Sequence, residues 1–469
     1  MKKHIRITLI LLLSAFVSQA QWQPDVRLTS DLSTSNTSYN NARCIASSGN
    51  FVHAVWYDGR DGNTEIYYKR STDGGITWGA DTRLTNGLGP SEYPTVSVAD
   101  SIVHVVWRDN RNGNFEIYYK RSTDAGLTWG TDTRLTNNTS VQWYPSMFSS
   151  KSDVCLVWQD ARDLNDEIYF KSSSDGGLTW GADTRLTNNT SYAQYPSVAI
   201  STSNVHLAWF DDRDGNQEIY YKRSADGGVS WGADTRLTNS VGNSWYPTLA
   251  VNGTVVHMVW YDDRNGNDEI YYKRSTDGGL SWGADVRLTN NTFSSSQPSI
   301  SVSGSMVHLV WVDWLDGNRE LYYKNSTDGG LTWGATTRLT NNTAASWYPS
   351  VAVSGSVVHV LWYDNRDGNE EIYYKRNPTA NTVGIKDMLS EALPFNVFPN
   401  PASTEINVRG SGNIDELSIT DILGKQIYSA NLINPTTELL ISTSDFPVGI
   451  YYIQAKIGNS INVQKLIKL

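Results

Sequence analysis

The sequence has little of what supports a disulfide-linked, membrane-spanning or nucleic-acid-binding protein. Only two of its 469 residues are cysteine, Cys44 and Cys155, and they fall on different expected strands, so we predict buried free thiols. No apolar run approaches the roughly 18 residues of a spanning helix. No cluster of Lys or Arg stands out and the net charge is −10, which disfavours a nucleic-acid partner. Proline is scarce, whereas aromatic residues make up 12% of the chain, a composition typical of β-rich folds.

Residues 1–20 have the pattern of an export signal. Three Lys or Arg residues fall within the first six, residues 7–16 form a short apolar stretch, and small side chains lie at Ser18 and Ala20. A basic start, an apolar core and a small-residue cleavage site define a signal peptide. We therefore expect a mature protein that starts at Gln21, has no transmembrane segment and lies outside the cytoplasm.

An eight-residue pattern recurs six times at a fixed spacing. Its copies read STDGGITW, STDAGLTW, SSDGGLTW, SADGGVSW, STDGGLSW and STDGGLTW, and each ends 51 residues after the one before, at Trp78, Trp129, Trp180, Trp231, Trp282 and Trp333. A strict period of this length predicts identical supersecondary units stacked on one another, because one unit cannot bury its own apolar face.

A longer pattern, which first reads VHAVWYDGRDGNTEIYYKRS, recurs seven times with the same spacing. In the last unit, residues 348–353, 357–363 and 371–376 are extended runs, and a fourth kind of run is seen at residues 337–340 of the preceding unit. Four antiparallel strands per 51 residues are typical of a propeller blade. We predict an all-β protein whose residues 21–376 form a seven-bladed β-propeller.

The seventh unit lacks its own fourth strand, and the other end of the chain supplies a match. Residues 22–29, WQPDVRLT, align with residues 78–85, WGADTRLT. We infer that the N-terminal segment forms the outer strand of blade seven, which closes the ring and removes the exposed sheet edges of an open arc.

The C-terminal part has strand alternation and turns but no 51-residue repeat. We expect a linker over residues 377–393 and a small β-sandwich over residues 394–469, in which FNVFPNPASTEINV, DILGKQIY, DFPVGIYYIQ and a final QKLIKL follow in order. This region resembles the type A C-terminal sorting domain of the type IX secretion system of Gram-negative Bacteroidota. The resemblance implies passage across the outer membrane, removal of the tail, and a body that is secreted or held at the cell surface.

The eight-residue pattern resembles the Asp-box of the sialidase and BNR-repeat families. Its aspartate can accept hydrogen bonds from turn N–H groups, its glycine can take a positive φ, and its tryptophan can anchor the turn on the blade. Catalysis needs one site and not six, so we interpret the box aspartates as structural: Asp73, Asp124, Asp175, Asp226, Asp277 and Asp328.

Two further repeated sets invite a functional interpretation. In the D-x-R-x-G-N-x-E pattern of Asp58, Arg60 and Glu65 the arginine stands where a calcium ligand should be, so we predict an Asp–Arg–Glu network and no metal. Six histidines share one position in the second strand, three residues before its tryptophan, and Cys155 takes that position in blade three. We predict that these six histidines are packed and hydrogen-bonded rather than zinc ligands.

Departures from the repeat are where we expect function. Of 18 tryptophans, fourteen belong to repeated strand or box positions, and four fall in long connections: Trp143, Trp245, Trp314 and Trp347. An exposed indole stacks on a sugar ring and keeps its N–H free. Packing between blades is the alternative interpretation of these four residues.

Blade one departs differently, because Arg43 stands where other blades have proline. The segment ARCIASSGNFVHAVWYDGR resembles the first-blade segment of sialidases, whose two arginines bind the substrate carboxylate, and Arg43 and Arg60 match them in place. The resemblance ends there, because Cys44 and Ile45 replace Ile-Pro and sialidases have six blades. No nucleophilic tyrosine, glutamate partner or acid/base aspartate can be singled out.

We therefore favour a secreted or cell-surface propeller that binds glycans or proteins through its long-loop face, with the type IX secretion machinery as a second partner and no cofactor. A divergent sialidase-like glycoside hydrolase is the alternative. It would need a unique carboxylate or tyrosine–glutamate pair at the centre, which near-identical blades do not display.

Overall fold

The computed structural model describes residues 22–40, 43–315, 317–380, 395–421, 425–457 and 460–469. The chain divides into two compact units, Met1–Thr382 and Val383–Leu469. The expected signal peptide and most of the expected linker lie outside the described residues. Every regular element in the described ranges is a β-strand. None of these ranges holds a helix that could cross a membrane.

The described residues of the first unit form seven antiparallel sheets, six with four strands and one, in blade one, with five. The innermost strands are β3 (Ile45–Ser48), β7 (Ser91–Ala99), β11 (Gln142–Ser150), β15 (Ala193–Ser201), β19 (Ser244–Asn252), β23 (Ser295–Ser303) and β27 (Ser346–Ser354). The second strands are β4 (Phe51–Asp58), β8 (Ile102–Asp109), β12 (Asp153–Asp160), β16 (Asn204–Asp211), β20 (Val255–Asp262), β24 (Met306–Asp313) and β28 (Val357–Asp364).

The third strands are β5 (Glu65–Ser71), β9 (Glu116–Ser122), β13 (Glu167–Ser173), β17 (Glu218–Ser224), β21 (Glu269–Ser275), β25 (Glu320–Ser326) and β29 (Glu371–Asn377). The outer strands are β6 (Thr82–Arg83), β10 (Thr133–Arg134), β14 (Thr184–Arg185), β18 (Thr235–Arg236), β22 (Val286–Arg287), β26 (Thr337–Arg338) and β1 (Val26–Arg27). A short extra strand, β2 (Ser35–Asn36), pairs with β4 in blade one.

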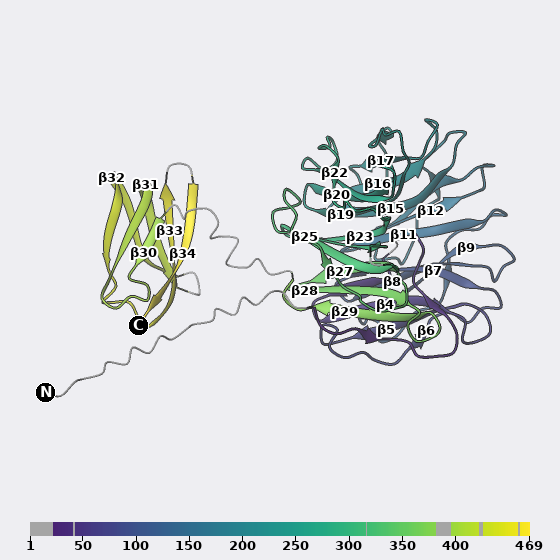
Figure 1. The fold of residues 1–469 in the computed structure, drawn as a ribbon, viewed down its shortest axis with the longest axis horizontal. Helices are drawn as coiled ribbons and strands as arrows, with labels where there is room; N and C mark the ends of the chain where they lie inside the picture. Colours follow the sequence, from purple (N-terminus) through teal and green to yellow (C-terminus); the bar gives the residue numbers. More distant parts are fainter. Residues whose placement is uncertain (1–21, 41–42, 316, 381–394, 422–424, 458–459) are drawn as a thin grey trace. The chain divides into compact units, whose positions relative to one another are not determined.

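The blades follow one another around a closed ring (Figure 1). Innermost strands of neighbouring blades contact each other all the way round, including β27 with β3. The predicted seven-bladed β-propeller is therefore confirmed. The box turns and the short turns between the first and second strands lie on one face, which we call the box face. The connections from the second to the third strand, and from each blade to the next, lie on the opposite long-loop face.

The N-terminal segment closes the ring as predicted. Strand β1 pairs antiparallel with β29, with Val26 opposite Tyr374 and Arg27 opposite Tyr373. The Arg27 guanidinium also donates a hydrogen bond of 2.7 Å to the buried carboxylate of Glu371. Blade seven is thus built from both ends of the propeller sequence, and its outer edge is paired.

The second strand of each blade is an almost continuous apolar run, because both faces of a blade are covered by its neighbours. In β8, for example, Val103, Val105, Val106 and Trp107 are all fully buried. The seven second-strand tryptophans are the largest fully buried side chains of the molecule. The core is therefore a series of seam clusters between blades rather than one central cluster.

Six innermost strands carry a β-bulge at the same proline position, at a tyrosine–proline step in five of them and at Gln297–Pro298 in β23. The register of β11 with β12 shifts between Trp143 and Ser146, because Pro145 has no N–H to give to the ladder. Tyr144, inside the bulge, has a φ of 50°. This left-handed conformation costs a non-glycine residue about 1–2 kcal/mol and turns the tyrosine away from the strand.

The described residues of the C-terminal unit form five strands: β30 (Phe395–Phe398), β31 (Glu405–Asp421), β32 (Gln426–Ser442), β33 (Gly449–Ile457) and β34 (Ser460–Lys468). They belong to one sheet in which β31 pairs with β30, β32 and β33. The predicted small β-sandwich takes the form of this single sheet, curled into a nearly closed barrel. Its core includes Ile406, Ile419 and Ile453.

A candidate binding site on the long-loop face

Each blade is tied to the next on the long-loop face by one repeated backbone bond. The residue before the third-strand glutamate offers its carbonyl to the first innermost-strand N–H of the following blade, as Thr64 does to Ser91 at 2.8 Å. The side chain at this position varies from blade to blade. It lies beside the residue 28 positions later, which varies as well.

At five seams these two variable positions contact each other, and the kind of contact differs from seam to seam. Phe115 and Trp143 pack ring against ring with centroids 6.0 Å apart, Gln194 donates to Asp166 at 2.7 Å, and the indole N–H of Trp245 donates to Gln217. The guanidinium of Arg319 lies over the Trp347 ring, 3.5 Å from its centroid. Trp143, Trp245 and Trp347 are therefore half-buried seam residues as well as surface residues.

An incomplete ring of tyrosines lies around the central tunnel on this face, and Gln297 takes the corresponding position in blade six. The ring consists of the bulge residues of five blades and one residue from the insertion in blade one: Tyr93, Tyr144, Tyr195, Tyr246, Tyr348 and Tyr39. Neighbouring rings touch, with centroids 4.3 Å apart for Tyr144 and Tyr195 and 4.9 Å apart for Tyr39 and Tyr348. Burial raises the pKa of Tyr93 and of Tyr348 to about 12.

Arg43 extends across the tunnel. Its guanidinium donates to the carbonyl of Leu249 at 2.8 Å and to that of Val198 at 3.2 Å, and it lies over the Phe148 ring. Burial lowers the pKa of Arg43 to about 10. A cavity of about 160 Å³ adjoins it, lined by hydroxyls such as Ser97 and by strand backbone. The predicted carboxylate-binding arginine thus contacts main-chain carbonyls of blades four and five.

Arg60 lies in a separate carboxylate network. It binds Asp58 at 2.6 Å, Asp81 at 2.7 Å and Asp31 at 2.8 Å, and it stacks on Tyr67. The predicted Asp–Arg–Glu network is corrected in one respect, because Glu65 binds Arg83 instead, at 2.8 Å. The same Asp–Arg–Asp arrangement recurs at Arg111, Arg162, Arg213, Arg264 and Arg366.

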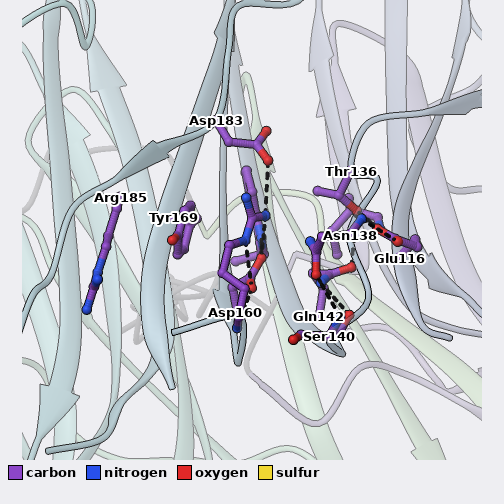
Figure 2. A network of polar contacts seen from close by, with 12 residues as sticks. Glu116, Thr136, Asn138, Ser140, Gln142, Asp160, Tyr169, Asp183 and Arg185 are labelled. Carbon is purple, nitrogen blue, oxygen red and sulfur yellow. Dashed lines mark hydrogen bonds and ion pairs between the residues drawn. The ribbon is translucent and has the colours of Figure 1, made fainter. Parts of the chain in front are cut away.

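Figure 2 shows these contacts at the seam of blades two and three. Asp160 and Asp183 flank the Arg162 guanidinium at 2.6 and 3.0 Å. Beside them, the hydroxyl of Thr136 donates to Glu116 at 2.5 Å, and Gln142 donates to Asn138. The repeated carboxylates of the long loops therefore have protein donors already.

The box aspartates accept hydrogen bonds from groups of their own turns. Asp226 accepts hydrogen bonds from the hydroxyls of Ser224 and Ser230 and from the Ser230 N–H. These bonds lower the pKa of Asp226 to about 2. The other five boxes repeat the pattern.

The histidines are buried and hydrogen-bonded, as predicted. Nδ1 of His206 lies 2.7 Å from the hydroxyl of Tyr221, and the other five make the same contact with the tyrosine 15 residues later. Blade three has Cys155 in place of histidine and Phe170 in place of tyrosine. The two changes belong together, because a tyrosine hydroxyl there would have lost its partner. Both cysteines are free and buried.

Blade six departs most from the repeat on this face. Leu315 replaces the network arginine, and Trp314 beside it is 46% exposed. The guanidinium of Arg319 lies between two indoles, 4.9 Å from the centroid of Trp314 and 3.5 Å from that of Trp347. Within the described residues, no carboxylate pairs with Arg319. The adjoining connection from blade five exposes Phe293.

The six sequence-predicted ligand residues are therefore divided. Trp314 and Trp347 both lie against Arg319 at the seam of blades six and seven. Trp143 and Trp245 belong to other seams, and Arg43 and Arg60 are bound to protein groups. Arg319 was missed by sequence reasoning. The available signal was the residue before the third-strand glutamate, where no other blade has an arginine. Among the described residues, no three His, Cys, Asp or Glu side chains are placed to hold a metal ion.

Comparisons of sequence agree with the two-part organisation. A family profile described as a BNR repeat-like domain matches residues 8–209, and one described as a secretion system C-terminal sorting domain matches residues 396–469. Xyloglucanase Xgh74A of Acetivibrio thermocellus is 26% identical over 285 residues, which are 56% of this chain. The matched region spans 28% of the xyloglucanase.

Among solved structures, one shares the fold at low sequence identity, and a second is a weaker match. Polysaccharide lyase Uly1 has a TM-score of 0.52 and 10% identity, over 76% of this chain and 99% of the lyase. A Trypanosoma rangeli sialidase has a TM-score of 0.44 and 12% identity, over 82% of this chain and 84% of the sialidase.

Proposed function

We propose that this chain, a BNR-repeat β-propeller with a secretion-system C-terminal sorting domain, is a glycan-binding protein whose ligand is held at blade six of the long-loop face. The sorting domain directs export by the type IX secretion system, to the cell surface or the medium. A surface-displayed propeller meets polymers outside the cell, and the match to a protein named a xyloglucanase favours a carbohydrate over a protein ligand.

The observation that carries the proposal is the position of Arg319 between Trp314 and Trp347. Stacking on two indoles fixes the guanidinium without a carboxylate, so its N–H donors remain for a ligand. The exposed face of Trp314 offers a flat apolar surface of the kind that stacks on the C–H face of a pyranose ring. Phe293, 47% exposed, extends this surface.

The charge of the site favours an acidic glycan. A guanidinium binds a carboxylate with two parallel hydrogen bonds, which a neutral sugar cannot accept as strongly. Burial lowers the pKa of Arg319, but arginine stays protonated at neutral pH. We therefore propose polysaccharides that contain uronic or sialic acids as the preferred class.

Contacts at the tunnel favour binding over catalysis. A tyrosine nucleophile needs a lowered pKa, whereas burial raises the pKa of Tyr93 and Tyr348. Arg43 and Arg60 already bind carbonyls and carboxylates of the protein. A divergent sialidase-like glycoside hydrolase remains the alternative from sequence, and it is tested by turnover in the Discussion.

The test is binding to an array of neutral and acidic polysaccharides, followed by titration of the best ligand. Trp314→Ala should weaken binding at least tenfold by removing the stacking surface, and Arg319→Gln should weaken it for acidic ligands selectively. Tyr192→Ala is the control, because Tyr192 is 53% exposed on the same face but lies between blades three and four. Equal losses in all three variants, or none in any, would refute the assignment to blade six.

A further inference from the structure

The box face carries a second repeated arginine, at the third-strand position before the box. Five blades have arginine there, and in three of them the guanidinium donates to a carbonyl in the box of the next blade. Arg121 donates to Gly176 at 2.8 Å, and Arg274 donates to Gly329 at 2.9 Å. These side chains fill the outer end of the seam between blades.

Two blades lack this arginine, for different reasons. The first is blade six, which has Asn325. The blade that follows it, blade seven, has no box to receive a donor, because β1 takes the place of its box strand. Blade three has Ser172 although the box of blade four is complete. Within the described chain, no side chain donates to the carbonyl of Gly227, the position equivalent to Gly176. The acceptor is therefore present and its donor is missing.

Three other departures from the repeat fall in blade three beside the same seam. Cys155 replaces the larger histidine of the other blades, and Phe170 replaces their more polar tyrosine. Asp153 stands where four blades have an aliphatic side chain or methionine. A pocket of about 550 Å³ lies at this seam, and its lining includes Asp153, Ser172, Trp180 and Gly227. It lies on the face opposite the proposed glycan site.

The chemistry of the pocket is complementary to a cation. Its lining includes the carboxylates of Asp153 and Asp226 but no Lys, Arg or His. Asp226 already accepts bonds from its own box, whereas the Asp153 carboxylate accepts none from any described residue. Trp180, Val205 and Val229 supply apolar walls that suit the methylene chain of an arginine.

We propose that this pocket binds a guanidinium group supplied from outside the chain, in the place that arginine fills at the equivalent seams. The guanidinium donates to the Gly227 carbonyl and to Asp153, and its aliphatic chain packs on Trp180. Two sources have this chemistry: an arginine side chain of a partner polypeptide, and a small guanidino compound.

The test uses the mature full-length protein and Nα-acetylarginine methylamide, with binding followed by titration calorimetry. The citrulline analogue is the matched probe, since it keeps the shape and loses the charge. We expect binding of the arginine probe, at least tenfold weaker binding of the citrulline probe, and about tenfold weaker binding by Asp153→Asn. Ser172→Arg, which restores the residue of the repeat, should abolish binding and keep the fold, as checked by thermal unfolding.

Arg121→Ser provides a gain-of-function control at the neighbouring seam. It removes the donor to Gly176 and should create a second, weaker guanidinium site, because Ile102 there replaces the carboxylate of Asp153. Equal affinity for the arginine and citrulline probes, or unchanged binding by Ser172→Arg, would overturn the proposal, as would no binding of the arginine probe. Tighter binding of an arginine-containing hexapeptide than of the single residue would identify a polypeptide partner, and equal binding a small compound.

Discussion

The indole of Trp22 packs edge-on against the ring of Tyr323, with the ring centroids 5.0 Å apart. The box tryptophans make the same contact with the preceding blade, as Trp78 does with Tyr374 at 4.9 Å and Trp129 does with Tyr68 at 4.9 Å. Trp22 therefore does for blade seven what a box tryptophan does elsewhere, although no box precedes it. Ring closure depends on side-chain packing as well as on the pairing of β1 with β29.

Trp22→Ala should destabilise the propeller by about 2–3 kcal/mol, because it removes a half-buried aromatic side chain from the last seam. The melting temperature should fall by about 5 °C. Trp314→Ala is the control, since that indole lies at the surface and its loss should change stability by less than about 1 kcal/mol. A melting temperature that Trp22→Ala leaves unchanged would contradict the packing role.

Deletion of residues 21–29 should have a larger effect than the single substitution. It leaves the outer edge of β29 unpaired, and an exposed edge strand promotes aggregation. Light scattering on heating, compared between the deletion and Trp22→Ala, measures the difference. Identical aggregation onsets would mean that loss of the β1–β29 pairing promotes aggregation no further than loss of the Trp22 indole alone.

Stability should fall on mild acidification because of the buried histidines. Burial, with a smaller effect of Arg223, lowers the pKa of His206 to about 4, against about 6.5 in the unfolded chain. The unfolded state therefore binds protons first, so the contribution is complete above pH 6.5 and declines as the pH falls towards 4. Each such histidine should lower the free energy of unfolding at pH 5 by about 2 kcal/mol relative to its value above pH 6.5. Denaturant unfolding across this pH range measures the change.

Blade three supplies the control for this prediction. The double variant His206→Cys, Tyr221→Phe copies the Cys155 and Phe170 pair and removes one titrating group without leaving an unpaired hydroxyl. The number of protons taken up on unfolding near pH 5 should drop by about one. An unchanged pH slope would show that His206 is not the group responsible.

Gly126→Ala should be far more damaging than Gly113→Ala. Both glycines have positive φ, +80° and +97°, so both substitutions incur backbone strain of about 1–2 kcal/mol. A Cβ at Gly126 would also lie 1.8 Å from the hydroxyl of Tyr68, whereas nothing lies within 4 Å of one at Gly113. We expect a loss of at least about 3 kcal/mol for Gly126→Ala, measured by denaturant unfolding. Equal losses would mean that the seam adapts to the extra methyl group.

No release of fluorophore is expected from a panel of aryl glycosides that includes a sialoside. Arg43 binds carbonyls inside the tunnel, so Arg43→Ala should lower stability without changing any turnover. Turnover that Arg43→Ala abolishes, in a variant that still unfolds cooperatively near the wild-type temperature, would favour the sialidase-like alternative.

Much of the fold followed from the sequence, because the 51-residue period equals one blade. The alignment of residues 22–29 with residues 78–85 was enough to predict closure, and the Arg27–Tyr373 pairing confirms it. The histidines and the box aspartates were interpreted on a related ground: a residue repeated in nearly every blade is expected to serve a purpose that every blade shares.

The candidate site was less predictable. Arg43 donates to carbonyls that are 155 and 206 residues away in the sequence. No local sequence pattern predicts contacts over such separations. Arg319 was overlooked because aromatic departures from the repeat were sought and charged ones were not. The pairing of Phe115 with Trp143 depends on a spacing of 28 residues across a seam, which becomes meaningful only when the blades are placed side by side.

The residue pairs that differ from seam to seam have a consequence for how the number of blades can change in evolution. Units this similar in sequence invite loss or duplication of whole repeats by unequal recombination. Removal of blade two would bring Thr64 against Trp143 in place of Glu92, and the new neighbours could form neither the old hydrogen bond nor the old ring contact. A change in the order or number of blades would therefore break contacts that the present order allows.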